Sequence, residues 1–220
     1  MTFIPDLNTG NKYGFFNDFE NLLVGSIFAS SVSGTGGAVA SSDGEVGRPG
    51  IISLTSGTQS SGRAGISTAV TAHLLNPPIT LNFSLKIPVL SDGSNTFVIQ
   101  AGFLDTLTAD QTDGVYFEHD ISGHATNWRY CSSNNASRTK NSSSVAISTS
   151  GWMKLTIEIY TGPVAKFCVN GTLLGTINTN IPTGSGRMTG VGIAIRKSVG
   201  TSARLIYLDY ISCDGVLPER

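Results

Sequence analysis

The stretch that decides the fold runs from residue 152 to residue 177 and reads WMKLTIEIYTGPVAKFCVNGTLLGTI. Apolar residues at the odd positions 153 to 159 alternate with polar or amphipathic ones. A period of two is typical of a β-strand with one buried face, so these four residues should be buried together. Further along, Asn170-Gly171 is a dipeptide that favours the positive φ angles of a two-residue hairpin turn. The stretch therefore predicts an antiparallel meander of three strands.

Other segments repeat this pattern. Residues 79–87 (ITLNFSLKI) alternate in the same way, whereas 96–105 (TFVIQAGFLD) is almost continuously apolar and indicates a strand covered on both faces. Strands recur every 8 to 12 residues or so and no segment has a convincing helical period. We therefore expect an all-β protein, a two-sheet antiparallel β-sandwich. Residues 1–14 are expected to form an extended N-terminal arm, and 15–220 one sandwich domain.

Composition narrows the classes of function. Charged residues make up 13% of the 220 residues, against about 25% in typical proteins, and the formal net charge is −1. No stripe of Lys and Arg is present, so we expect no nucleic acid partner. No apolar run is long enough to span a bilayer, so we expect no membrane insertion. Three widely spaced cysteines form neither a disulfide framework nor a CxxC motif, which favours a reducing compartment.

One pair of carboxylates has the spacing that hydrolytic chemistry needs. Glu118 and Asp120 lie two residues apart on an expected strand and so share a face, the minimum for a glycoside hydrolase. The alternative is that both are solvated charges on an outer face. His119 and His124 flank Asp120, but strand alternation places His119 on the opposite face. We therefore predict no metal site, no cofactor and no catalytic residue.

Aromatic residues cluster in the region from residue 113 to residue 135. Aromatic faces bordered by amide and charged groups suit a neutral sugar, which binds by stacking and hydrogen bonding. This reasoning predicts a glycan site made of Tyr116, Asn127, Trp128, Arg129 and Tyr130, with an exposed aromatic face at Trp128. The alternative is that the two tyrosines pack within the sandwich and that Trp128 fills its rim.

Several motifs together resemble a known family. They are DGVYFEHD (113–120), the Trp128 strand, GWMKLTIEI (151–159), AKFCVNGTLLGTI (165–177) and ARLIYLDYI (203–211), with a Gly/Ser-rich opening at 34–65. These stretches resemble the concanavalin A-like jelly roll of the lectin and glucanase type, in particular the modules found in bacteriophage head and tail appendage proteins. The resemblance implies a jelly-roll fold. The E-x-D-x-x-E strand of the hydrolases of this fold is missing, as are alginate-lyase motifs and legume-lectin metal loops, so none of their functional residues carries over.

The resemblance leads to a functional hypothesis. We expect a non-enzymatic structural protein of a phage virion, as a head (capsid) decoration or a tail or fibre component, with host-surface or glycan contact. Other virion proteins would be its partners, the 1–14 arm would contact one of them, and the protein would form a homo-oligomer. It would be assembled in the host cytoplasm. The alternatives are a carbohydrate-active glycoside hydrolase that uses Glu118 and Asp120, and a free soluble lectin.

Overall fold

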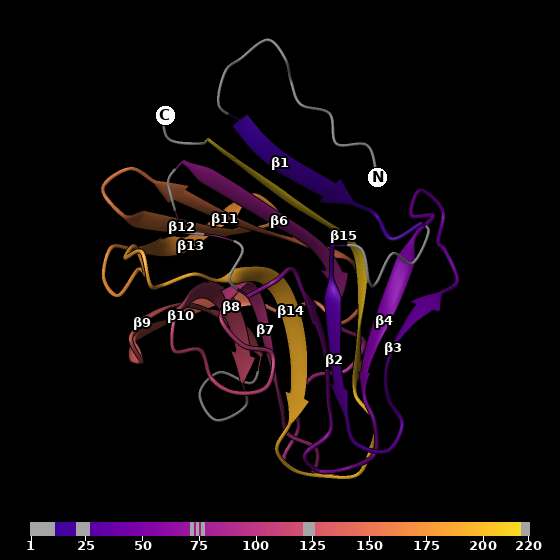
Figure 1. Cartoon of the computed structure of the whole chain (residues 1–220). Helices are drawn as coiled ribbons and strands as arrows, with labels where there is room; N and C mark the ends of the chain where they lie inside the picture. The colour runs from indigo at the N-terminus through magenta and orange to yellow at the C-terminus, as the bar shows by residue number, and fades with distance from the viewer. Residues whose placement is uncertain are drawn as a thin grey trace.

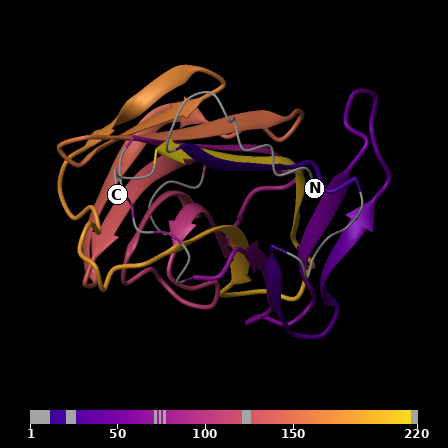
Figure 2. The same ribbon diagram turned by 45° about the horizontal axis from the view of Figure 1, so that its top comes forward.

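A computed structural model describes residues 12–20, 27–70, 73, 75, 78–120 and 126–216. Throughout these ranges the regular structure is β-strand, arranged in two antiparallel sheets that face each other (Figures 1 and 2). The predicted all-β, two-sheet antiparallel sandwich is confirmed. Within the described ranges, no helix has the length and apolar character needed to cross a bilayer.

The first sheet has eight strands. Its spatial order is β13 (Thr172–Ile177), β12 (Val164–Val169), β11 (Met153–Tyr160), β6 (Ile79–Lys86), β15 (Leu205–Val216), β4 (Ile51–Ser56) and β3 (Gly37–Ser42), with β1 (Lys12–Asn17) paired to β15. Neighbouring strands are often distant in sequence, since β15 lies between β6 and β4. Such crossovers join the two ends of the chain into one sheet.

The second sheet has seven strands and carries the candidate site. Its order is β10 (Ser137–Ala146), β9 (Asn127–Asn134), β8 (Gly114–Asp120), β7 (Phe97–Leu104), β14 (Gly190–Lys197), β5 (Arg63–Ser67) and β2 (Ala29–Ser33). Strands β7 to β10 follow one another in the chain, whereas β14 and β5 are inserted from elsewhere.

The central meander forms as the sequence predicts. Met153, Leu155, Ile157 and Ile159 are at most 1% exposed and belong to the core between the sheets. The β12–β13 turn places Asn170 at φ 50° and Gly171 at φ 79°, both in the left-handed region that a two-residue hairpin requires. The three strands pair in sequence order, and β11 also pairs with β6.

One segment differs from expectation. Residues 131–144 (CSSNNASRTKNSSS) read as a polar hairpin connection, but most of them are the paired strands β9 and β10. The connection is only the turn at Asn135 and Ala136, with φ 52° and 63°. Strand β10 is polar because it is the edge of its sheet, where Ser and Thr are tolerated without an apolar pattern.

The N-terminal arm falls mostly outside the described residues. Of the segment 1–14, only Lys12 to Gly14 is described, and these residues form the start of β1, paired with β15. The boundary that the sequence suggested at residue 14 thus lies within a strand of the first sheet.

Candidate functional site

The outer face of the second sheet is covered unevenly. Side chains of each strand alternate between the core and this outer face, so Glu118 and Asp120 of β8 point outward while Phe117 and His119 point inward. Towards one end of the strands the outward residues are buried, and at the other end they are partly exposed. The cover is the loop 105–113, which connects β7 to β8 and lies against the sheet.

An apolar contact holds this loop down. Leu107 is 8% exposed and forms a small second cluster with Leu104, Tyr116, Cys131 and Ala194, which come from four different strands. This cluster is separate from the core between the sheets. It explains why the continuous apolar run of β7 is covered on both faces, as the sequence indicates.

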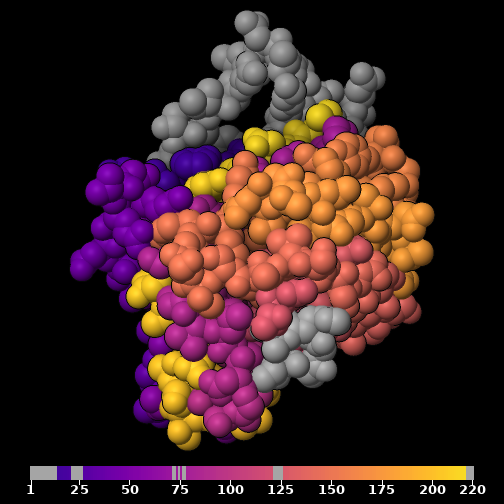
Figure 3. Space-filling model, turned by 180° about the vertical axis from the view of Figure 1, so that it is seen from behind, coloured from indigo at the N-terminus to yellow at the C-terminus, as the bar shows by residue number. Residues whose placement is uncertain are grey.

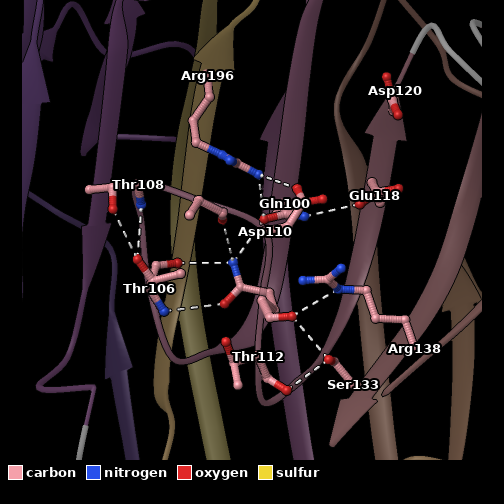
Figure 4. A network of polar contacts seen from close by, with 12 residues as sticks. Gln100, Thr106, Thr108, Asp110, Thr112, Glu118, Asp120, Ser133, Arg138 and Arg196 are labelled. Atoms are coloured by element: carbon pink, nitrogen blue, oxygen red, sulfur yellow. Dashed lines mark hydrogen bonds and ion pairs between the residues drawn. The ribbon is translucent and has the colours of Figure 1, made fainter. Parts of the chain in front are cut away.

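The side chain of Gln111 gives the loop its polar anchor. Its amide Nε2 donates to Oε1 of Gln100 on β7 at 2.8 Å, and its Oε1 accepts from the backbone N–H groups of Asp105 and Thr106 at 2.9 and 3.2 Å. Nε of Arg138 also donates to the Gln111 carbonyl at 3.0 Å. Figure 4 shows the surrounding network, in which Gln100 is bonded to both Glu118 and Arg196. Gln111 is 1% exposed.

Glu118 lies next in the same network and is also 1% exposed. Its carboxylate accepts from Nζ of Lys140 at 2.9 and 3.0 Å and from Nε2 of Gln100 at 2.9 Å, and Arg129 lies 3.1 Å away. Both oxygens are therefore engaged by neighbouring strands. A buried carboxylate held by two cations and an amide is a fixed structural group.

The uncovered end of this face forms a band across the strands, which we call the exposed band. It consists of partly exposed residues on five strands: Arg63, Arg196, Val98, Asp120, Asn127 and Arg129. Arg196 and Val98 are paired in register, as are Val98 and Asp120, so the band runs perpendicular to the strands. Figure 4 shows Arg196 and Asp120 at the same end of the sheet. Beside it, the loops 87–96 and 198–204 are joined by hydrogen bonds. Figure 3 shows the magenta and yellow segments of these loops side by side.

Charged groups in the band are tied to one another. Nη2 of Arg196 donates to Oδ1 of Asp110 at 3.1 Å and to Gln100 at 3.0 Å, and Arg129 lies 3.5 Å from Asp120. Burial by itself raises the pKa of Asp110, but the Arg196 hydrogen bond and the nearby Lys140 charge outweigh it, so the pKa of Asp110 is lowered. Asp110 therefore stays ionised at neutral pH.

The predicted glycan residues divide between the two faces of the sheet. Trp128 is 0% exposed and packs edge-on to Phe117 in the core, with ring centroids 5.8 Å apart. Tyr130 also points towards the core, and its ring centroid lies 5.5 Å from that of Phe167. The predicted exposed aromatic face at Trp128 is wrong, because the alternation of β9 directs residues 128 and 130 towards the core. The expectation that Trp128 fills a rim is wrong for the same reason.

The other three predicted residues lie on the outer face. Asn127 and Arg129 belong to the exposed band, and Asn127 donates to the Ser143 carbonyl at 2.9 Å. Tyr116 is covered by the loop and 0% exposed, and its hydroxyl has no hydrogen-bond partner in the described part of the chain. Burial raises the pKa of Tyr116. Sequence reasoning missed Arg63, Val98 and Arg196, since only strand pairing brings them beside Asp120.

The histidines near Asp120 were candidates for a metal site. His119 is 0% exposed in the core, on the opposite face from Asp120, as the alternation predicts. His124 lies outside the described residues. Across the described residues, no three His, Cys, Asp or Glu side chains are grouped closely enough to hold a metal ion.

Known structures share this architecture. An SO2946 protein of unknown function from Shewanella oneidensis MR-1 aligns with a TM-score of 0.69 and 15% identity, covering 95% of this chain and 88% of that one. The Emp47p carbohydrate recognition domain aligns with a TM-score of 0.62 and 12% identity, covering 93% of this chain and 96% of that one. An endo-1,3-beta-glucanase from Streptomyces sioyaensis aligns with a TM-score of 0.61 and 12% identity, covering 96% of this chain and 98% of that one. The chain thus has the jelly-roll fold of lectins and glucanases, as the concanavalin A-like resemblance implied.

Comparison of sequences gives the family. No curated protein matches this chain. One family model does match, over residues 47–209, a range that begins in the β3–β4 connection and ends within β15. Because this range covers most of the chain, the protein belongs to the SO2946-like, C-terminal domain family.

Proposed function

We propose that this protein is a non-catalytic carbohydrate-binding module whose ligand lies across the exposed band of the second sheet. The fold supports the proposal, since a carbohydrate recognition domain and a glucanase are among the similar structures. The band offers guanidinium, carboxylate and amide groups, which can donate to and accept from sugar hydroxyls. Its ligand contacts would therefore be hydrogen bonds, without the aromatic stacking that Trp128 was expected to supply.

The dimensions of the band suit a short oligosaccharide. Neighbouring strands are about 4.8 Å apart, so the three steps from β14 to β9 span about 14 Å. Arg196 and Asn127 stand at the two ends of this span, with Val98 and Asp120 between them. A chain of sugars lying perpendicular to the four strands would meet a polar side chain on three of them, β14, β8 and β9, and the apolar Val98 on β7.

The burial and ion pairing of the Glu118 carboxylate are the observations that favour a non-catalytic function. A glycoside hydrolase of the usual kind needs two carboxyl groups that both reach the sugar, one as acid and one as nucleophile or base. Glu118 is 1% exposed and is held by Lys140, Arg129 and Gln100, which leaves Asp120 as the partly exposed member of the pair. One accessible carboxylate supports binding but not that mechanism.

A glycan array combined with a reducing-sugar release assay tests this proposal. We expect binding without release of reducing ends. Asp120→Asn and Asn127→Ala should each weaken binding about threefold to tenfold, the effect of losing one hydrogen bond. Lys154→Gln on the exposed outer face of β11 is the control and should bind normally. Turnover that disappears in Glu118→Gln would instead establish a hydrolase.

We also propose, from the sequence resemblance alone, that the module is part of a phage virion. In that setting it would form a homo-oligomer, contact other virion proteins through residues 1–14, and present the band to host-surface glycans. Copurification of the intact protein with particles, and loss of incorporation when residues 1–11 are deleted, are the expected results. Normal incorporation of the truncated protein would refute the role of the arm.

A further inference from the structure

Two arginines face each other at one end of the exposed band. Arg63 on β5 is paired in register with Arg196 on β14, and both side chains are on the outer face. Residues directly opposite in antiparallel strands have Cβ atoms about 4.5 to 5.5 Å apart, and like charges in this position destabilise the sheet. The position opposite Arg63 on its other side is Ser33 of β2, which carries no charge, so the carboxylate beside the pair is that of Asp110, which contacts Arg196.

The Arg63 side chain has no partner within the described ranges of the chain. It makes neither an ion pair nor a side-chain hydrogen bond there, and its Nε is buried with no acceptor. Arg196 differs, because its Nη2 is bonded to Gln100 and Asp110. Its Nη1 and Nε make no hydrogen bond with the described residues. The two guanidinium groups therefore retain several donors that no described residue accepts.

Unused donors in this setting favour an external acceptor. The terminal nitrogens of Arg63, which donate to no described residue, belong to a partly exposed side chain and can meet an external acceptor, whereas the buried Nε cannot. An anion held by these nitrogens and by Arg196 would offset the repulsion of the like charges. Carboxylates suit the planar fork of a guanidinium because two parallel N–H···O bonds can form.

We propose that Arg63 and Arg196 form a subsite for the carboxylate of an acidic sugar, so that the ligand of the exposed band is a uronic-acid glycan. The inference rests on the proposed function, since it assigns one end of the same binding surface. Neutral sugars would occupy the stretch from Val98 to Asn127, and a carboxylate-bearing unit would be placed over β14 and β5. Specificity would then come from two strands that are far apart in the sequence.

Matched pairs of oligosaccharides test the subsite. The probes are hexamers of glucuronic, galacturonic, mannuronic and guluronic acid, each compared with its carboxyl-reduced neutral counterpart, and affinity is measured by calorimetry. At least one acid hexamer should bind about tenfold or more tightly than its reduced counterpart, with an advantage that shrinks as NaCl is raised. Arg63→Gln should remove most of that advantage, because it should weaken binding of the acid hexamer about tenfold and binding of the neutral hexamer much less.

Two further variants make the result specific. Arg63→Lys keeps the charge but loses the fork, so it should recover only part of the preference. Lys154→Gln removes the same charge from an exposed position on the first sheet and should leave the preference intact. Because Arg63 has no partner in the described structure, Arg63→Gln should fold with unchanged or higher stability in urea, which separates binding from folding.

The outcomes distinguish this inference from the proposed function. Equal binding of acid and neutral hexamers, or a preference that Arg63→Gln does not alter, overturns the subsite and leaves the carbohydrate-binding proposal standing. Failure of every acid and neutral glycan to bind overturns both. Binding of single-stranded DNA that competes with the acid hexamers and is lost in Arg63→Gln would assign the pair to phosphate and also overturn the subsite.

Discussion

Acidification should destabilise the protein through one buried histidine. His119 is 0% exposed between the sheets, packs edge-on to Phe97 at 5.5 Å, and accepts a long 3.4 Å hydrogen bond from the Ser91 N–H through Nε2. Its Nδ1 is buried without a partner in the described residues. Burial lowers the pKa of His119 from 6.5 to about 4, and the Asp120 charge opposes this shift. The folded protein therefore excludes the protonated form.

The sign and size of the effect follow from linkage. Between pH 6.5 and about pH 4 the unfolded chain binds more protons at this position than the folded one, so the free energy of unfolding falls as the pH falls. This contribution to stability is complete above pH 6.5 and is lost towards pH 4. One pKa unit corresponds to about 1.4 kcal/mol, so the full loss is about 3 kcal/mol, with about 2 kcal/mol already lost at pH 5.

Urea unfolding at pH 7.5 and pH 5.0 measures this loss. His119→Gln cannot titrate but keeps a side-chain acceptor for the Ser91 N–H, so its stability should depend less steeply on pH. Other ionisable groups are shared and cancel in the comparison. The stability difference between the native protein and the variant should shift by about 2 kcal/mol between the two pH values. Identical pH dependence of the two proteins would refute the assignment to His119.

Three substitutions test other parts of the structure. Ala136→Gly should raise stability by about 1 kcal/mol and Tm by about 2 to 4 °C in thermal unfolding, because residue 136 has φ 63° and a glycine relieves that strain; an unchanged or lower Tm would contradict this. Trp128→Ala should cost about 3 to 5 kcal/mol in urea unfolding, since Trp128 is a core residue, and the folded fraction should keep its glycan affinity. Glu118→Gln should lower the free energy of unfolding by about 3 kcal/mol in the same assay, because Arg129 and Lys140 lose their shared anion, and full stability in that variant would argue against a fixed ion pair.

The fold was predictable wherever a strand has one buried face. Alternation at residues 153–159 and the Asn170-Gly171 turn were enough to place the meander, because period and turn chemistry are local properties. Polar strand β10 carries no such local signal, since an edge strand needs no apolar face and its turn contains Ala136 where glycine is usual. In such segments the backbone ladder and not the side-chain pattern determines the structure.

The site was less predictable because it is assembled across strands. Strand alternation correctly separates His119 from Asp120, and in β9 the same alternation directs Trp128 inward and Arg129 outward. The pairing of Arg63 with Arg196 depends on β14 lying between β5 and β7, a crossover that no local pattern encodes. The cover over Tyr116 likewise depends on where one loop folds.

The loop 105–113 determines how deep a ligand can reach into this sheet. Its anchors, Leu107 and Gln111, occupy the area above Tyr116 and Gln100 that would otherwise continue the exposed band. A relative with a shorter connection between β7 and β8 would present Glu118, Gln100 and the Tyr116 hydroxyl on the floor of an open groove. Loop length alone could therefore convert a shallow recognition surface into a deep one, with the same strands and the same polar groups beneath.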